Sequence, residues 1–271
     1  MAITTLAQLI AAPKQHLTLF KGGTRTVAAS IPWTMFDIAG YPPAGTLAIG
    51  NTANGVVHTA AITGYPAINT FNATGYISKV SFCGVNAGNN INRLKLYDRL
   101  FSAGAYSFNS NVSLTAQPSY AGRVPGGDYK GLEIWLETVT AFTGSQSIAI
   151  TYLDQDGVSS VTGTIATGVA PTVGRMFRVP LAAGDSGVQR IDVVTSSVST
   201  VGTFNVHVMR PLWHSGTLGN TANTSSMEEI VHDLTKTGLV QIYDTSALVV
   251  TQSASSTTTA ALDLLIEVAD G

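Results

Sequence analysis

Residues 131–137 read Gly-Leu-Glu-Ile-Trp-Leu-Glu, and this stretch decides the fold class. Leu132, Ile134 and Leu136 alternate in it with two glutamates and a tryptophan. A period of two residues places alternate side chains on opposite faces of a strand, so the stretch is typical of a half-buried antiparallel strand. Residues 148–152 and 204–208 show the same alternation.

Turn-forming residues separate these strand-like runs. Residues 154–157 read Asp-Gln-Asp-Gly, and Gly157 can adopt a positive φ without strain. We also predict a turn between a strand that ends near Val179 and one that starts near Val188. Short strands with Gly or Pro between them favour an all-β fold, an antiparallel β-sandwich or a jelly-roll-like arrangement.

We expect two helices beside the strands. The first is short and N-terminal, capped by Thr4 or Thr5, and it ends before Pro13. The second lies near residues 226–236, where Ser226 and Glu229 fit a capping box and Gly238 is a natural stop. Its expected apolar stripe consists of Met227, Ile230, Val231 and Leu234.

The chain divides into three expected regions. Residues 1–75 form an N-terminal arm and a loop-rich β region, and residues 76–214 form a central β-sandwich. Residues 215–271 add the second helix and further strands, which we expect to pack on the same core. A helix as short as the N-terminal one is marginal in water. We therefore expect it to be buried, as an arm on a neighbouring subunit or, alternatively, on its own domain.

Charge is scarce in this sequence. Only 11% of the residues are charged, against about 25% in an ordinary soluble domain. Residues 38–78, 157–174 and 193–209 contain no Asp, Glu, Lys or Arg. Buried strands and neutral loops would explain part of this scarcity. We favour the interpretation that neighbouring subunits cover much of the surface, because charged residues are depleted at the cores of permanent interfaces.

The remaining composition limits the partners. The net charge of −2 gives no electrostatic reason to expect nucleic acid. No apolar run is long enough to span a membrane, and no basic residue precedes Lys14 as in a secretory signal. The single cysteine, Cys83, excludes an intrachain disulfide and favours a reducing compartment.

One stretch, Gly184-Asp185-Ser186-Gly187, resembles the nucleophile loop of chymotrypsin-like serine proteases. His58 and Asp98 precede Ser186 in the order of that family. The residues around His58 and the Val188 after Gly187 depart from the family pattern, so we favour a plain turn. A protease remains a remote alternative.

The other candidate sites are weak. The five histidines are scattered, and Asp154 with Asp156 lacks the rest of a calcium loop. We therefore expect no metal site, no cofactor and no enzymatic activity. Arg93, Lys95, Tyr97 and Arg99 would share one face of a strand, which could bind single-stranded nucleic acid. We favour a solvated face or a contact with an acidic neighbouring subunit.

Four segments carry a family resemblance. Residues 96–101, 131–137, 150–157 and 179–188 together resemble uncharacterised virion structural proteins of tailed bacteriophages. The resemblance spans residues 76–211, about half of the chain. It implies a β-rich component of the particle and supplies no catalytic residues.

From these observations we expect a non-enzymatic capsid decoration or cement subunit, assembled in the host cytoplasm and located in the virion. Its expected partners are the major capsid protein or other virion subunits, and its expected form is a homo-oligomer such as a trimer. The alternative is a carbohydrate-binding or receptor-binding β module of a tail or fibre, with Trp33, Trp135, Trp213 and Tyr129 as candidates. The predicted interface residues are Leu6, Leu9, Ile10, Trp33, Arg93, Tyr97, Trp213 and His214.

Overall fold

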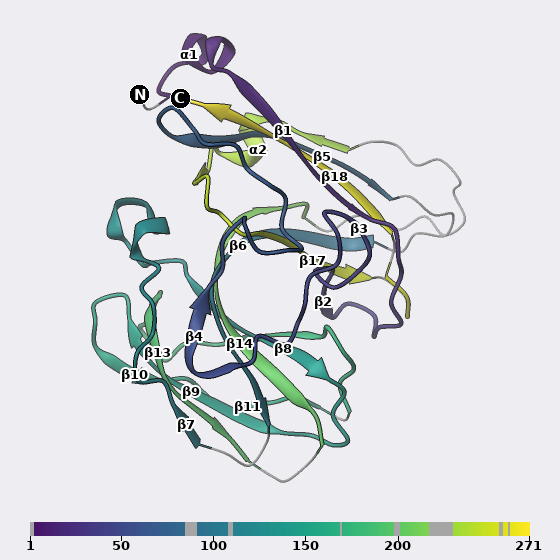
Figure 1. Cartoon of the computed structure of the whole chain (residues 1–271), viewed down its shortest axis with the longest axis vertical. Helices are drawn as coiled ribbons and strands as arrows, with labels where there is room; N and C mark the ends of the chain where they lie inside the picture. The colour runs from purple at the N-terminus through teal and green to yellow at the C-terminus, as the bar shows by residue number, and fades with distance from the viewer. Residues whose placement is uncertain are drawn as a thin grey trace.

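The computed structural model describes residues 3–84, 91–107, 111–168, 170–197, 201–216, 230–254, 257–259 and 261–271. Its strands form three antiparallel sheets, which confirms the predicted all-β fold (Figure 1). We call them the terminal, central and distal sheets.

The terminal sheet contains both ends of the described chain. Its main strand order is β15-β5-β18-β1-β3, and β16 also pairs with β5. The strands are β1 (Lys14–Lys21), β3 (Gly40–Tyr41), β5 (Gly75–Gly84), β15 (Ile230–His232), β16 (Gln241–Ile242) and β18 (Leu262–Asp270). Because β18 pairs with both β1 and β5, strand pairing joins residues from all three predicted regions.

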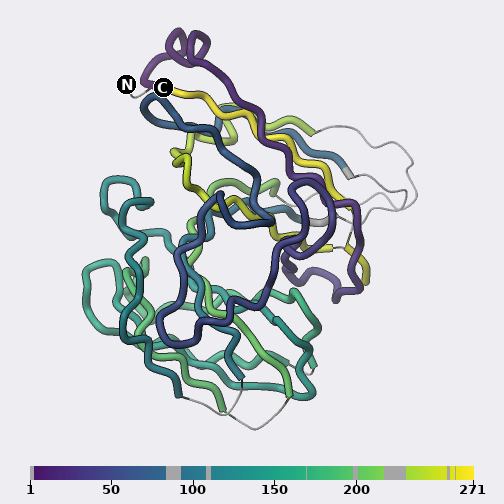
Figure 2. Tube along the Cα trace, in the orientation of Figure 1, coloured from purple at the N-terminus to yellow at the C-terminus, as the bar shows by residue number. Residues whose placement is uncertain are grey.

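The central sheet has seven strands and curls until its two edges meet (Figure 2). Its order is β12-β8-β14-β6-β17-β2, and β4 pairs with β6 off this path. At the edges, Trp33 forms a bridge with Arg175, and the Thr34 amide donates to the Gly174 carbonyl at 2.8 Å. The strands are β2 (Pro32–Thr34), β4 (Asn51–Val57), β6 (Ile91–Ser107), β8 (Glu133–Thr140), β12 (Met176–Val179), β14 (Thr203–His214) and β17 (Leu248–Ala254).

The distal sheet has five strands in the order β10-β9-β13-β7, with β11 also paired to β9. They are β7 (Asn111–Ser113), β9 (Ser147–Asp154), β10 (Ser159–Val161), β11 (Ile165–Ala166) and β13 (Val188–Ser196). The predicted turns are confirmed: Gly157 adopts a φ of 81° between β9 and β10, and a loop joins β12 at Val179 to β13 at Val188. Two short 3₁₀ helices, η1 (Ala121–Arg123) and η2 (Pro125–Gly127), precede β8.

Two apolar cores cover the outer face of the central sheet. Leucine, isoleucine and valine side chains of β6, β8 and β14 pack against Ile148, Ile150 and Ile191 of the distal sheet. Another part of this outer face, including Leu96 and Val250, packs against the terminal sheet. Burying this apolar area contributes the main favourable free energy of folding.

The N-terminal helix is confirmed as α1 (Leu6–Ala11). Thr5 is its N-cap and forms a capping box with Gln8, a local interaction that the sequence already specifies.

The predicted second helix is wrong over Ile230–His232, because these residues form strand β15 against β5. The β-branched Ile230 and Val231 suit this pairing better than a helix. The predicted capping box at 226–229 lies outside the described residues. A one-turn helix, α2 (Leu234–Thr237), begins after Asp233 and ends at Gly238. The predicted stop at Gly238 is thus confirmed.

Candidate functional site

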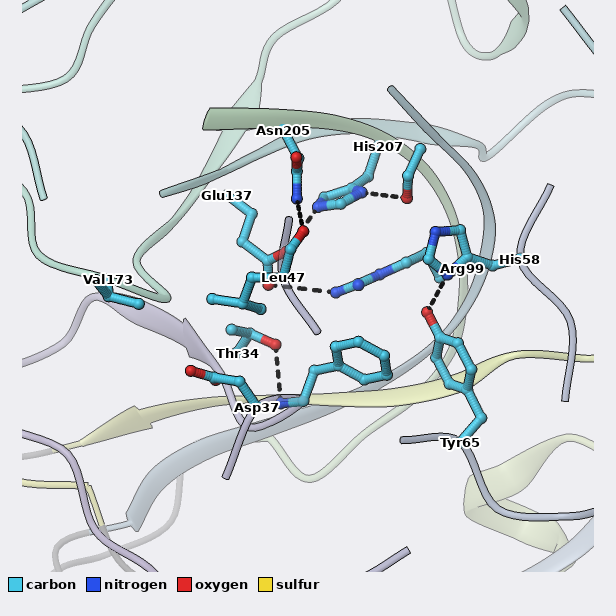
Figure 3. Close-up of polar contacts among 12 residues, drawn as sticks. Thr34, Asp37, Leu47, His58, Tyr65, Arg99, Glu137, Val173, Asn205 and His207 are labelled. Atoms are coloured by element: carbon cyan, nitrogen blue, oxygen red, sulfur yellow. Dashed lines mark hydrogen bonds and ion pairs between the residues drawn. The ribbon is translucent and has the colours of Figure 1, made fainter. Parts of the chain in front are cut away.

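The inner face of the curled central sheet carries a buried polar cluster (Figure 3). His207 on β14 lies at its centre. The Nδ1 atom of His207 is 2.6 Å from the Ser102 hydroxyl on β6, and its Nε2 atom is 3.0 Å from Glu137 Oε2 on β8. The other Glu137 oxygen accepts a hydrogen bond from Arg99 at 3.3 Å. Ser102, His207 and Glu137 are each 0% exposed.

The charges of this cluster follow from burial and pairing. Burial would raise the pKa of Glu137, but Arg99 and the hydrogen bond from His207 outweigh it and lower that pKa to about 2. Burial and the neighbouring Arg99 lower the pKa of His207 to about 4. At neutral pH, therefore, Glu137 is ionised and His207 is neutral. The neutral imidazole donates from Nε2 to Glu137 and accepts from Ser102 at Nδ1.

The burial of this inner face differs from the prediction that these strands are half-buried. The alternation is right, but β8 and β14 are buried on both faces and not half-buried. The predicted solvated face of β6 is likewise wrong for Tyr97 and Arg99, which are buried, although Arg93 is exposed. The polar side chains avoid solvent because the curled sheet brings opposite charges and hydrogen-bond partners together on its inner face.

A serine, a histidine and a carboxylate in a row resemble a catalytic triad. Here, however, none of the three side chains reaches the surface, so a substrate carbonyl cannot approach the Ser102 hydroxyl in this structure. The arrangement instead connects three neighbouring strands through their side chains. The sequence analysis did not single out Ser102 or Glu137.

A second buried cluster surrounds Asp98. Its carboxylate accepts hydrogen bonds from the Ser246 hydroxyl and the Ala247 amide, both at 2.9 Å. It also pairs with Arg123 at 3.1 Å and with Arg210 at 3.6 Å. Arg123 in addition donates to the Arg99 carbonyl at 2.7 Å, so the two buried clusters are adjacent.

The residues of the predicted protease have other partners. The Asp98 carboxylate is bound as described above, and the His58 Nδ1 atom lies 2.7 Å from the Tyr65 hydroxyl. The Ser186 amide donates to Gln155 Oε1 at 2.8 Å in the loop before β13. None of the hydrogen bonds described for these residues connects Ser186, His58 and Asp98 as a triad.

The predicted interface residues divide by exposure. Leu9, Trp33, Tyr97 and Trp213 are buried within the chain, and the Trp213 indole donates to His232 at 3.0 Å. The four others, Leu6, Ile10, Arg93 and His214, are exposed. Their interface role stays a prediction.

The aromatic residues of the carbohydrate-binding alternative are mostly inside the molecule. Trp33, Trp135 and Trp213 are 2%, 2% and 4% exposed. Carbohydrate modules of the predicted kind would present exposed aromatic rings, and of the four candidates only Tyr129 is partly exposed.

The acidic turn at Asp154 has a local role. Its carboxylate accepts the Asp156 and Val158 amides, both at 2.8 Å, and so closes the turn between β9 and β10. Within the described ranges there is no group of three or more His, Cys, Asp or Glu side chains placed to hold a metal ion. Within the same ranges, no helix is long and apolar enough to cross a membrane.

Comparisons with known proteins give only distant likenesses. No protein-family model and no curated protein matches the chain. The VP2 subviral particle of infectious bursal disease virus is similar with a TM-score of 0.21 and 11% identity, over 96% of this chain and 80% of that one. A family 30 carbohydrate-binding module has a TM-score of 0.24 and 11% identity, over 78% and 93%.

A third structure, that of PirA, is similar with a TM-score of 0.19 and 15% identity, over 29% of this chain and 68% of that one. The similarities to a viral capsid protein and to a carbohydrate-binding module are therefore weak. They define neither the fold nor the function, which rest on the residues described above.

Proposed function

We propose that the chain is a non-enzymatic structural subunit of a bacteriophage particle, a capsid decoration or cement protein that stabilises the head through contacts with the major capsid protein and with its own copies. The observation that carries this proposal is a surface that is poor in charge and exposes large apolar side chains. Such a surface is more typical of a subunit in permanent contact with other proteins than of a monomer free in solution.

The scarcity of charge extends to the surface itself. The sequence has 14 basic and 16 acidic side chains. Seven of those in the described part of the chain are buried, so few remain to cover an accessible area of 11236 Å². The buried ones are Lys21, Asp98, Arg99, Arg123, Glu137, Asp154 and Arg210. A freely soluble surface would carry about 25–35% charged residues, which keep identical copies apart.

Two groups of exposed apolar side chains lie beside the terminal sheet. Leu6 and Ile10 on α1 are 63% and 73% exposed, and Ile230, Val231 and Leu234 are exposed at the β15 edge. An edge strand with apolar side chains is a natural place for pairing with another chain. Both places are consistent with assembly into an oligomer.

The α1 surface gives a direct test. We expect Leu6→Ser combined with Ile10→Ser to leave the melting temperature nearly unchanged, because both side chains already face solvent. Self-association of the purified chain in sedimentation velocity should weaken by about tenfold or more, since each apolar side chain buried in an interface contributes about 1.5–3 kcal/mol.

Val201→Ser is the matched control, because Val201 is 70% exposed and lies in the loop before β14. It should change neither stability nor association. An unchanged sedimentation profile for the double variant, or a monomeric parent chain at all concentrations, would contradict the α1 contact. Cryo-electron microscopy of the intact particle would then locate the subunit by its copy number and symmetry.

The proposed lack of enzymatic activity has a separate test. We expect no labelling of the purified chain by a fluorophosphonate probe, because Ser102 is buried and Ser186 lacks a bonded histidine base. Mass spectrometry of the labelled peptides provides the measurement. Stoichiometric labelling that disappears in Ser102→Ala or Ser186→Ala would overturn the non-enzymatic proposal.

A further inference from the structure

Residues 35–66 cover the inner face of the central sheet, and their side chains contact the buried His207 cluster. The Phe36 ring lies under the Arg99 guanidinium, 4.8 Å from it, and 4.7 Å from the Tyr65 ring. The Leu47 carbonyl accepts a hydrogen bond from Asn205 at 2.6 Å. Strand β4 anchors the middle of this segment by pairing with β6. We call the parts on either side, residues 35–50 and 58–66, the cover arms.

The cover arms are packed too closely to tolerate extra atoms. A Cβ atom at Gly45 would lie 2.2 Å from the Phe36 ring, and one at Gly64 would lie 2.5 Å from it. The two arms thus pack tightly on each other around the Phe36 ring, which in turn lies against Arg99. Such close packing leaves little space for water beneath the arms.

Two neutral histidines belong to this closed arrangement. His207 faces Glu137 on β8 and Arg99 and Ser102 on β6. His58, in the second cover arm, bonds to Tyr65 and faces Arg99, His207, Glu137 and Arg123. The single carboxylate among these groups, Glu137, is already paired with Arg99.

The balance of charges within the cluster makes its closed form sensitive to acid. Among these groups Glu137 is the one anion for Arg99 and for a protonated His207, so a proton on either histidine gives the cluster a net positive charge beside Arg99. In a dry interior such a charge is costly unless water or a new partner reaches it. Detaching the cover arms would admit water to the cluster, whereas β9 and β18 are held by apolar side chains packed on the outer face of the sheet.

We propose that the cluster is an acid-sensitive latch: protonation of His207 and His58 releases the cover arms from the inner face. The short strand β3, which lies in the first arm, then separates from β1, while the β5–β18–β1 part of the terminal sheet and the distal sheet stay folded. The stability of the closed form changes with pH in the direction that this proposal requires. Burial lowers the pKa of His207 to about 4, and burial together with Arg99 lowers the pKa of His58. The closed form thus binds fewer protons than the open form below about pH 6.5, and its stability falls as the pH falls.

Hydrogen exchange of the full chain, read by mass spectrometry and corrected for intrinsic rates, tests the latch. Between about pH 7 and pH 4.5, peptides from the cover arms should lose protection by about tenfold or more relative to peptides from β9 and β18. The variants His207→Gln and His58→Gln should reduce this loss, because glutamine stays neutral and can still donate and accept hydrogen bonds. His214→Gln, at an exposed histidine, should leave it unchanged.

Two results would overturn the proposal. One is a loss of protection in the cover arms that is equal in the parent chain and in both glutamine variants. The other is opening of the arms only together with β9 and β18. If a glutamine variant does not fold at neutral pH, NMR of the parent chain replaces it. The proposal then requires the imidazole signal of His207 to titrate over the same pH range in which the arms open. Opening of the arms at a higher pH, before that signal moves, would refute the latch.

Discussion

Glu137→Ala is expected to lower the free energy of unfolding by about 3–5 kcal/mol, the usual cost of removing one partner from a buried ion pair. Arg99, 1% exposed, would keep its charge without a carboxylate to balance it. His207 would lose the acceptor of its Nε2 proton as well. The inner face offers no other carboxylate to either group among the contacts described above.

Urea denaturation at neutral pH measures this effect. Glu137→Gln keeps most of the shape but removes the charge, so it should fall between the parent chain and Glu137→Ala. The double variant Glu137→Leu with Arg99→Met replaces both charges by apolar groups and should be more stable than Glu137→Ala. Asp192→Ala, which removes a surface pair with the half-exposed Arg190, serves as control and should cost at most about 1 kcal/mol.

A loss below about 1 kcal/mol for Glu137→Ala would contradict this account, since it would mean that Arg99 tolerates a dry environment without its partner. A double variant no more stable than Glu137→Ala would indicate that packing, and not the unpaired charge, sets the cost. The two results distinguish the electrostatic role of Glu137 from its role as a space-filling side chain.

The strands around Ile134, Ile150 and Val206 could be predicted from sequence because a two-residue period is a local property of an extended backbone. The capping box at Thr5 and the turn at Gly157 are local in the same sense. Strand β15 was missed because Ile230 and Val231 are extended only through their pairing with β5, which lies about 150 residues away in the chain.

The candidate site was missed for a related reason. Polar residues on alternate positions normally face solvent, and nothing local marks Glu137 or His207 as buried. Their burial depends on the curl of the central sheet, which places them beside Arg99 from a third strand. The sequence did contain one indication of the cluster. Charge is scarce in this chain, yet β6, β8 and β14 each carry a charged or titratable residue (Arg99, Glu137 and His207) on the face opposite their apolar side chains.

The burial of the tryptophans was not predicted for the same reason. Trp213 stacks edge-on to Phe82 of β5, with ring centroids 5.3 Å apart, and so belongs to the core between the terminal and central sheets. A tryptophan in sequence carries no mark that separates a core residue from a ligand platform, because both roles use the same large apolar ring.

Asp98→Ala is expected to be as damaging as Glu137→Ala, with a loss of about 3–5 kcal/mol. The Asp98 carboxylate pairs with Arg123 and Arg210 and also accepts the Ala247 amide and the Ser246 hydroxyl. Its removal leaves two cations without their carboxylate counter-charge and the Ala247 amide without its acceptor. Ser246→Ala removes a single neutral donor and should cost about 1 kcal/mol, which separates the ionic part from the hydrogen-bonded part.

A double-mutant cycle with Arg123 decides whether the ion pair itself carries the loss. Arg123 also donates to the carbonyls of Arg99 and Thr245, so Arg123→Met has a cost of its own. If the unpaired charge dominates, adding Arg123→Met to Asp98→Ala should cost much less than Arg123→Met does in the parent chain, with a coupling of about 1–3 kcal/mol by urea denaturation. Strictly additive losses would show that Asp98 acts through the Ala247 amide and Ser246 instead. The carboxylate would then hold the turn before β17 and would not serve as the counter-charge of the buried arginines.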